Sequence, residues 1–133
     1  MIAEVQTPIS VLLIEDTPDV LELLKEVLKT AGFAVLTAEN GEEAWEVLST
    51  VRPDVVAPDI IITDLRLPKL NGLELIKRIK ATPGLNQIPI IATTAEHETA
   101  LERAKEFGAN ATLVKPIVTA DLVELIPRLL QKD

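Results

Sequence analysis

The chain has 133 residues, of which 47% are hydrophobic and 26% are charged, and it contains no cysteine. This composition predicts one globular domain and excludes a fold that depends on disulfides. The 13 basic and 21 acidic residues give a formal net charge of −8, which disfavours nonspecific binding to nucleic acid or to an anionic membrane surface.

Short apolar segments alternate with longer amphipathic segments along the chain. The apolar segments are rich in Ile, Val and Leu and lack polar alternation, which is typical of strands buried on both faces of a parallel sheet. We expect these strands at residues 11–14, 34–36, 60–62, 88–92 and 111–114.

The amphipathic segments are predicted helices. The first begins after Thr17, a candidate N-cap followed by Pro18 at the first helical position, and ends before Gly32. Residues 52–59, which read RPDVVAPD, are expected to form an extended loop because Pro58 makes a continuous strand improbable. The remaining helices are expected at residues 42–48, 73–80, 100–107 and 120–130.

A strand-helix order repeated five times predicts an α/β fold, in which helices cover both faces of a parallel sheet. No linker or low-complexity segment interrupts this order. We therefore expect a short N-terminal tail at residues 1–9 and a single domain at residues 10–133.

Polar side chains follow four of the predicted strands. Glu15 and Asp16 follow the first strand and Asp64 the third, and Thr94 and Lys115 come after the fourth and fifth. Ligands of open parallel sheets bind beyond the carboxyl ends of the strands, so these side chains are expected to meet. Carboxylates gathered there would repel one another unless a cation were bound, and oxygen ligands favour Mg²⁺ over Zn²⁺.

A carboxylate in such a site can also act as a nucleophile toward phosphorus and form an aspartyl phosphate. Phosphoryl transfer needs in-line positioning and neutralisation of charge on the phosphoryl oxygens. Mg²⁺, the Lys115 amine and the Thr94 hydroxyl could supply that neutralisation.

Each of these residues also has an ordinary structural explanation. Glu15 and Asp16 could form a solvated turn, Asp64 could be a turn residue, and Thr94 could bond to local backbone groups. Lys115 and Pro116 could form an ordinary strand exit. Their position at four of five strand ends, all on one edge, favours a shared site.

Four segments resemble the motifs of receiver domains of two-component response regulators, including the chemotaxis regulators. Residues 11–20 (VLLIEDTPDV) resemble the acidic pair of the family, and residues 62–72 (ITDLRLPKLNG) its phosphoacceptor loop. Residues 88–96 (IPIIATTAE) and 108–116 (GANATLVKP) resemble its Thr-Ala and Lys-Pro strands. The resemblance implies a flavodoxin-like, doubly wound sheet of five parallel strands in the order 2-1-3-4-5, with five helices.

The resemblance also implies how the acids are used. Asp64 would be the phosphoacceptor, and its donor would be a phosphohistidine on a sensor histidine kinase or a phosphotransfer protein. Glu15, Asp16, Asp64 and the backbone carbonyl of Arg66 would hold Mg²⁺, with the longer side chain of Glu15 acting through a water.

Thr94 would be the switch hydroxyl, Lys115 would pair with the phosphoryl group, and Pro116 would follow a cis peptide bond. The family usually has Tyr or Phe three residues before the lysine, whereas this chain has Thr112 and no Tyr. The usual relay to the surface of the fourth helix, fifth strand and fifth helix is therefore in doubt. Either Thr112 transmits differently, or the signal leaves by another face.

Arg66 and Glu96 occupy positions that tune self-dephosphorylation in similar proteins, and opposite charges there could hinder the attacking water. The alternative is that they are two exposed charges without a partner. His97, the sole His, could sense pH near the site, but a lone loop histidine is more often inert. Trp45 is expected to pack partly buried on the second helix, where it could lie too far from Asp64 to report binding.

The expected activity is a two-state switch, in which the phosphoryl group attracts Thr94 and Lys115 and changes a surface for an unknown downstream protein. Two alternatives are a phosphohydrolase with an Asp nucleophile and an interaction module independent of phosphorylation. The first needs a cap that the sequence does not supply, and the second would not need the complete set of site residues.

We therefore expect a protein that is not an enzyme and catalyses only its own phosphorylation and dephosphorylation. No apolar run reaches transmembrane length and the N-terminus lacks a basic signal region, which favours a cytoplasmic location. We expect no direct binding to nucleic acid or membrane, and a monomer or a weak dimer through the fourth helix, fifth strand and fifth helix. The last helix runs almost to the end of the chain without a linker, which favours a stand-alone regulator over an excised domain.

Overall fold

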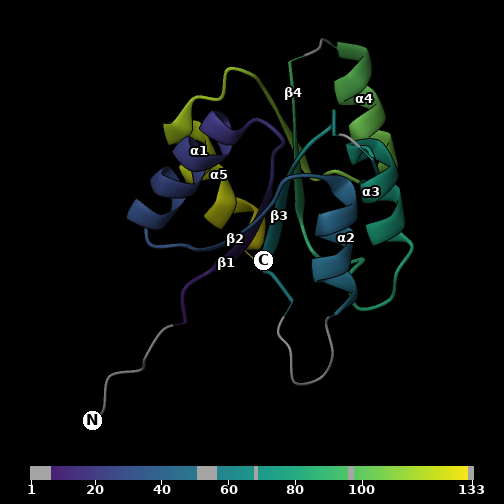
Figure 1. The fold of residues 1–133 in the computed structure, drawn as a ribbon, viewed down its shortest axis with the longest axis horizontal. Coiled ribbons are helices and arrows are strands. Elements are labelled where there is room, and N and C mark those ends of the chain that lie inside the picture. Colours follow the sequence, from purple (N-terminus) through teal and green to yellow (C-terminus); the bar gives the residue numbers. More distant parts are fainter. Residues whose placement is uncertain (1–6, 51–56, 68, 96–97, 132–133) are drawn as a thin grey trace.

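The computed structural model describes residues 7–50, 57–67, 69–95 and 98–131, and its centre is one parallel sheet. The strands lie in the order β2-β1-β3-β4-β5, as the resemblance implies (Figure 1). Their bounds are β1 Ser10–Ile14, β2 Ala34–Ala38, β3 Ile60–Asp64, β4 Ile90–Thr94 and β5 Ala111–Val114.

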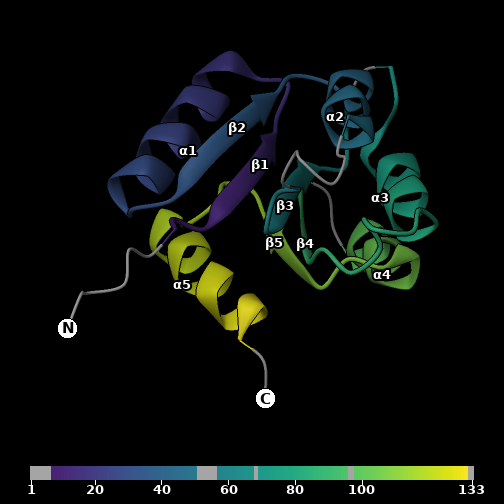
Figure 2. The same cartoon turned by 90° about the horizontal axis from the view of Figure 1, so that it is seen from below.

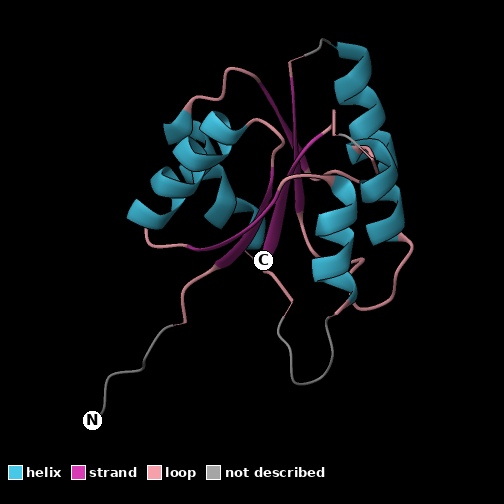
Figure 3. Cartoon of the chain, viewed as in Figure 1, coloured by secondary structure: helices cyan, strands magenta, loops and turns pink. Residues whose placement is uncertain are grey.

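Helices cover both faces of this sheet. Figures 1 and 2 show α1 and α5 on one face and α2, α3 and α4 on the other, and Figure 3 separates the strands from the helices that enclose them. The helices are α1 Pro18–Thr30, α2 Gly41–Ser49, α3 Gly72–Lys80, α4 Glu98–Phe107 and α5 Thr119–Leu130. The predicted α/β, doubly wound architecture is confirmed.

The sheet divides an aliphatic core into two clusters. Along β1, Leu12 and Ile14 belong to the cluster beneath α2, α3 and α4, whereas Val11 and Leu13 belong to the one beneath α1 and α5. This alternation follows from the period of two residues in a strand. Every residue of β3 and β4 is buried, which explains why the apolar runs lack polar alternation. Burial of each Leu or Ile contributes about 1.5–3 kcal/mol.

The predicted bounds of the fourth strand, 88–92, were wrong at both ends. Pro89 has no N–H to donate, and the N–H of Ile88 donates instead to the carbonyl of Leu85 in a turn. The strand therefore begins at Ile90, which pairs with Ile61, and it ends at Thr94. As a result, Thr94 is the last residue of its strand rather than a residue beyond it, and the same holds for Asp64 in β3.

The helices begin and end close to the predicted positions, but their capping hydrogen bonds differ in part from those expected. Thr17 is the N-cap residue of α1 and Pro18 opens the helix, yet the Thr17 side chain makes no capping hydrogen bond. Gly32 follows the helix with a φ of 100°, which a residue with a side chain rarely adopts. Asn40 and Asn71 were not predicted as N-caps, yet their side chains accept hydrogen bonds from backbone N–H groups in the first turns of α2 and α3.

Two expectations concern segments that are only partly described. Residues 52–56 of the predicted loop and residues 1–6 of the predicted tail lie outside the described residues. The domain bounds therefore stay a prediction. Within the described part of the chain, no helix has the length and apolar character needed to cross a membrane.

Candidate functional site

A lysine joins two buried carboxylates at the carboxyl edge of the sheet. The Lys115 ammonium donates to Glu15 Oε1 at 2.7 Å and to Asp64 Oδ2 at 2.6 Å. Glu15 is 1% exposed and Asp64 is 6% exposed, so the pair is largely shielded from water. The side chains come from the ends of β1, β3 and β5, which confirms that these strand ends meet at one place.

The contacts of Lys115 explain how two carboxylates can be buried together. Burial alone would lower the pKa of Lys115, but hydrogen bonds and charge interactions with Asp64 and Glu15 outweigh it and raise the pKa above its usual 10.5. The second Glu15 oxygen, Oε2, accepts a hydrogen bond from the backbone N–H of Thr17 at 3.1 Å. The repulsion expected between the acids is thus partly relieved by Lys115, a contact that the sequence analysis did not foresee.

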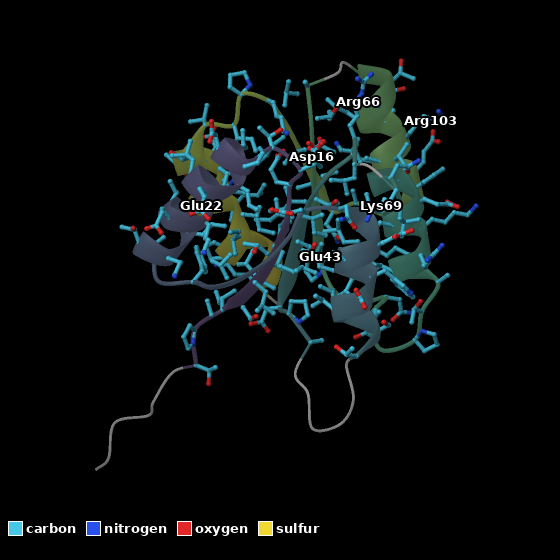
Figure 4. The ribbon with its side chains drawn as sticks, in the orientation of Figure 1. Asp16, Glu22, Glu43, Arg66, Lys69 and Arg103 are labelled. Atoms are coloured by element: carbon cyan, nitrogen blue, oxygen red, sulfur yellow. The ribbon has the colours of Figure 1, made fainter. Side chains whose placement is uncertain are left out.

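A third carboxylate completes the cluster. Glu15, Asp16 and Asp64 each offer an oxygen within 4.8 Å of the others, and Asp16 is exposed whereas the other two are buried. Figure 4 places Asp16 and Arg66 at the end of the molecule where the carboxyl ends of the strands lie. An all-carboxylate set with one open side suits a hard cation such as Mg²⁺ and suits Zn²⁺ poorly. The residues therefore fit the metal that the sequence predicts.

The loop after β3 is held closely against Asp64. Asp64 Oδ1 accepts a hydrogen bond from the backbone N–H of Arg66 at 2.9 Å, and the N–H of Gly72 donates to the carbonyl of Leu65 at 3.0 Å. A Cβ at residue 72 would overlap the backbone carbonyl of Asp64. The role of Gly72 is therefore to let α3 begin directly against the main chain of the candidate phosphoacceptor.

The other predicted site residues lie on β4, on β5 and in the loops beside them. Thr94 is buried at the end of β4, and Thr112 is half-buried on β5 in register with Ala92. The Lys115–Pro116 peptide bond is cis, as expected. Because residues 96 and 97 lie outside the described residues, the proposals for Glu96, His97 and the Arg66–Glu96 pair are not tested.

Two hollows flank the carboxylate cluster, and neither was predicted from the sequence. One has a volume of about 430 Å³ and is lined by Asp16 and by residues of the β3–α3 region. The other, also about 430 Å³, is mainly apolar and lies between α1 and the segment that follows β5. The second is lined by Val20, Leu23, Leu24, Ala95, Lys115, Pro116 and Ile117. The sequence signal for this hollow is the apolar set Val20, Leu23 and Leu24 in α1, of which Leu23 is exposed.

Trp45 on α2 lies partly buried against the core cluster beneath α2, α3 and α4, as predicted. The guanidinium of Arg78 on α3 lies 5.3 Å from the centroid of its ring, within the range of a cation–π interaction. Trp45 therefore belongs to the contact between α2 and α3.

Comparisons with known proteins agree with this geometry. Residues 11–127 match the family model described as the response regulator receiver domain. The chain is 32% identical over 123 residues to the two-component response regulator ORR3 of Oryza sativa subsp. indica, covering 92% of this chain and 91% of that protein.

Two solved structures are similar over most of both chains. The signal receiver domain of a signal transduction histidine kinase from Syntrophus aciditrophicus has a TM-score of 0.81 and 34% identity, with 91% and 89% of the chains covered. The receiver domain of the sensor histidine kinase PA1611 from Pseudomonas aeruginosa PAO1, described with a magnesium ion coordinated in its active-site cleft, has a TM-score of 0.83 and 29% identity, with 93% and 98% covered. By sequence and by fold, the chain belongs to the response regulator receiver domain family of two-component signalling.

Proposed function

We propose that Asp64 accepts a phosphoryl group from a phosphohistidine of a sensor histidine kinase or a phosphotransfer protein. A carboxylate oxygen of Asp64 forms a bond to phosphorus, the bond from phosphorus to the imidazole nitrogen breaks, and that nitrogen keeps the electron pair and takes up a proton. The observation that carries this proposal is the buried Asp64 carboxylate with the Lys115 ammonium 2.6 Å away.

Glu15, Asp16, Asp64 and the backbone carbonyl of Arg66 would hold Mg²⁺, which when bound neutralises charge on the phosphoryl oxygens. The closely spaced carboxylate oxygens of the first three residues support this assignment. The magnesium ion described for the PA1611 receiver domain supports it by similarity.

Lys115 and Thr94 would convert phosphorylation into a change of shape. Lys115 already contacts Asp64, so its ammonium can pair with phosphoryl oxygens attached to that residue, and the Thr94 hydroxyl can approach them. A shift in the populations of the two conformations from 1:99 to 99:1 needs a free-energy preference of about 5.5 kcal/mol for the favoured conformation. Two charge-assisted hydrogen bonds of about 1.5–3 kcal/mol each approach that value. The result would be an altered surface for a downstream protein.

The apolar hollow beside Lys115 supports a protein as the phosphoryl donor. Leu23 and Val118 are 58% and 60% exposed, and Leu23 is among the residues that line the hollow. Exposed apolar surface next to a reactive group is typical of a site that another protein covers. A donor protein that docks here would bring its phosphohistidine to the edge where Asp64 lies.

The remaining expectations accompany this function. We propose that the protein is cytoplasmic, acts on no substrate other than its own Asp64, and binds neither nucleic acid nor membrane directly. A monomer or a weak dimer through α4, β5 and α5 stays a prediction. Multiple turnover on a phosphomonoester would favour the alternative of an Asp-nucleophile phosphohydrolase.

The experiment is incubation with acetyl phosphate or phosphoramidate, with and without Mg²⁺, followed by intact mass measurement. We expect the wild type to gain the mass of one phosphoryl group only with Mg²⁺, and Asp64→Asn to gain none. Asp59→Asn is the matched control, because Asp59 lies before β3 and its side chain bonds to the backbone of Ser10. A wild type that gains no mass, or an Asp64→Asn variant that gains as much, would overturn the proposal.

A further inference from the structure

The loop that follows Asp64 contacts two helices through its backbone. At one end, a Cβ on Gly72, the first residue of α3, would overlap the carbonyl of Asp64. At the other, a Cβ on Gly41, the first residue of α2, would overlap the carbonyl of Leu70. Contacts between backbones cannot be relieved by rotation of a side chain. A displacement of this loop toward either helix must therefore move the start of that helix.

Both helix starts are also fixed by the same local device. Asn40 accepts a hydrogen bond from the N–H of Glu43 at 2.8 Å, and Asn71 accepts one from the N–H of Glu74 at 2.9 Å. Such capping holds the first turn of each helix in a defined position. The helices should consequently respond to the loop as rigid units rather than by fraying.

The two helices meet again farther from the site, at Trp45 and Arg78. The 5.3 Å separation between the Arg78 guanidinium and the Trp45 ring depends on how α2 and α3 lie against one another. Trp45 is the only tryptophan of the chain, so tryptophan fluorescence comes from this position and responds to changes around it, including this contact.

Phosphorylation would change the hydrogen bond that holds the start of the loop to Asp64. The N–H of Arg66 donates to Asp64 Oδ1, and the carboxylate also accepts from Lys115. Whichever oxygen takes the phosphoryl group, the carboxylate loses its delocalised negative charge. The Arg66 N–H therefore loses the carboxylate as its charge-assisted acceptor, and the bond that holds the loop to Asp64 has to form again with an acyl or a phosphoryl oxygen.

We propose that phosphorylation of Asp64 shifts α2 relative to α3 through the loop between β3 and α3, so that the α2–α3 surface presents the phosphorylation state. This inference rests on the proposed function.

The test follows Trp45 fluorescence and intact mass in the same sample, first with Mg²⁺ alone and then with added acetyl phosphate. The emission maximum or intensity should change in proportion to the phosphorylated fraction and should not change in Asp64→Asn. Full phosphorylation with an unchanged Trp45 signal would overturn the inference while leaving the proposed function intact. A sample that gains no phosphate would overturn both.

Two variants and the NMR chemical shifts of the backbone amides distinguish a movement of α2 relative to α3 from a general change of the fold. Arg78→Ala should be phosphorylated to the same extent but lose most of the fluorescence change. Lys77→Ala, an exposed neighbour on the same helix, should keep both. The changes in backbone amide NMR chemical shifts on phosphorylation should be larger in residues 41–49 and 72–80 than in residues 98–107 and 111–114. Shifts concentrated in the latter two ranges would overturn the inference.

Discussion

Both ends of the sheet carry polar side chains, but these side chains have different hydrogen-bond partners at the two ends. At the amino ends of the strands, Asp59 Oδ2 accepts from the N–H of Ser10 at 2.8 Å, and Asn110 Oδ1 accepts from the N–H of Ile90 at 2.9 Å. Each residue also donates its own backbone N–H to the same neighbour. At the carboxyl ends, Lys115 instead joins two side-chain carboxylates.

Two lysines show the same contrast. The Lys80 ammonium lies near the amino end of β4, 3.4 Å and 3.3 Å from the carbonyls of Asn86 and Ile88, and burial lowers its pKa. The carboxylates around Lys115 raise its pKa instead. Polar side chains that bond to the backbone stabilise the fold. Charged side chains that pair with one another, as around Lys115, remain available to a cation or a phosphoryl group. The partner of a polar side chain therefore indicates its role better than its burial does.

The largest expected effect separates two aspartates at opposite ends of β3. Asp64→Asn should lose phosphorylation completely, because an amide is a poor nucleophile toward phosphorus. Asp59→Asn should retain it, since the substituted side chain keeps an oxygen acceptor for the N–H of Ser10. Intact mass after treatment with acetyl phosphate and Mg²⁺ checks both variants. An equal loss of phosphorylation in the two variants would show that the two ends of the sheet do not have different roles.

Lys115→Met should destabilise the metal-free protein by about 2–3 kcal/mol, below the 3–5 kcal/mol of a fully buried pair, because water partly reaches the ammonium. The cost arises because Glu15 and Asp64 would remain buried without their shared cation. Urea unfolding measures the change. Adding Glu15→Gln to Lys115→Met should recover part of the loss, and a double variant less stable than Lys115→Met would contradict this explanation.

Asn110→Ala should lower the free energy of unfolding by about 1–2 kcal/mol, because the N–H of Ile90 loses its acceptor. Phosphorylation by acetyl phosphate should be unchanged, since the residue lies at the amino end of β5. Urea unfolding and intact mass, applied to the same preparation, check the two parts. A loss of phosphorylation in a folded Asn110→Ala variant would show that the amino end also serves the site.

The smallest effect concerns pH. The pKa of Lys115 is raised in the folded state, so its contribution to stability is fully present below the ordinary value of 10.5 and is lost as the pH rises through the folded value. The stability difference between wild type and Lys115→Met should therefore narrow above pH 10.5. Urea unfolding at neutral and alkaline pH measures it, and a difference that stays constant would mean that the ion pairs contribute nothing.

The sequence predicted the strand order and the meeting of the strand ends because both follow from local patterns in a parallel fold. It could not predict that Lys115 bridges Glu15 and Asp64, which lie 100 and 51 residues away from it in the chain. Such a contact depends on the side-chain conformations that the packed fold permits. The clash that only glycine avoids at residues 41 and 72 likewise appears only when the loop and the helices are in place.

Other omissions had a signal in the sequence. Asn40 and Asn71 both precede a glycine and stand three residues before a glutamate, a pattern that predicts a capped helix start. Pro89 within the fourth apolar run likewise indicated that the strand begins after it.

The most direct test of the central claim is the position of the phosphoryl group among the 21 acidic residues. Borohydride reduces an acyl phosphate but leaves free carboxylates intact, so a phosphorylated aspartate becomes homoserine and can be located by peptide fragmentation. We expect homoserine at position 64 alone, and only in samples treated with both Mg²⁺ and a phosphoryl donor. Homoserine at another acidic position, or at none, would contradict it.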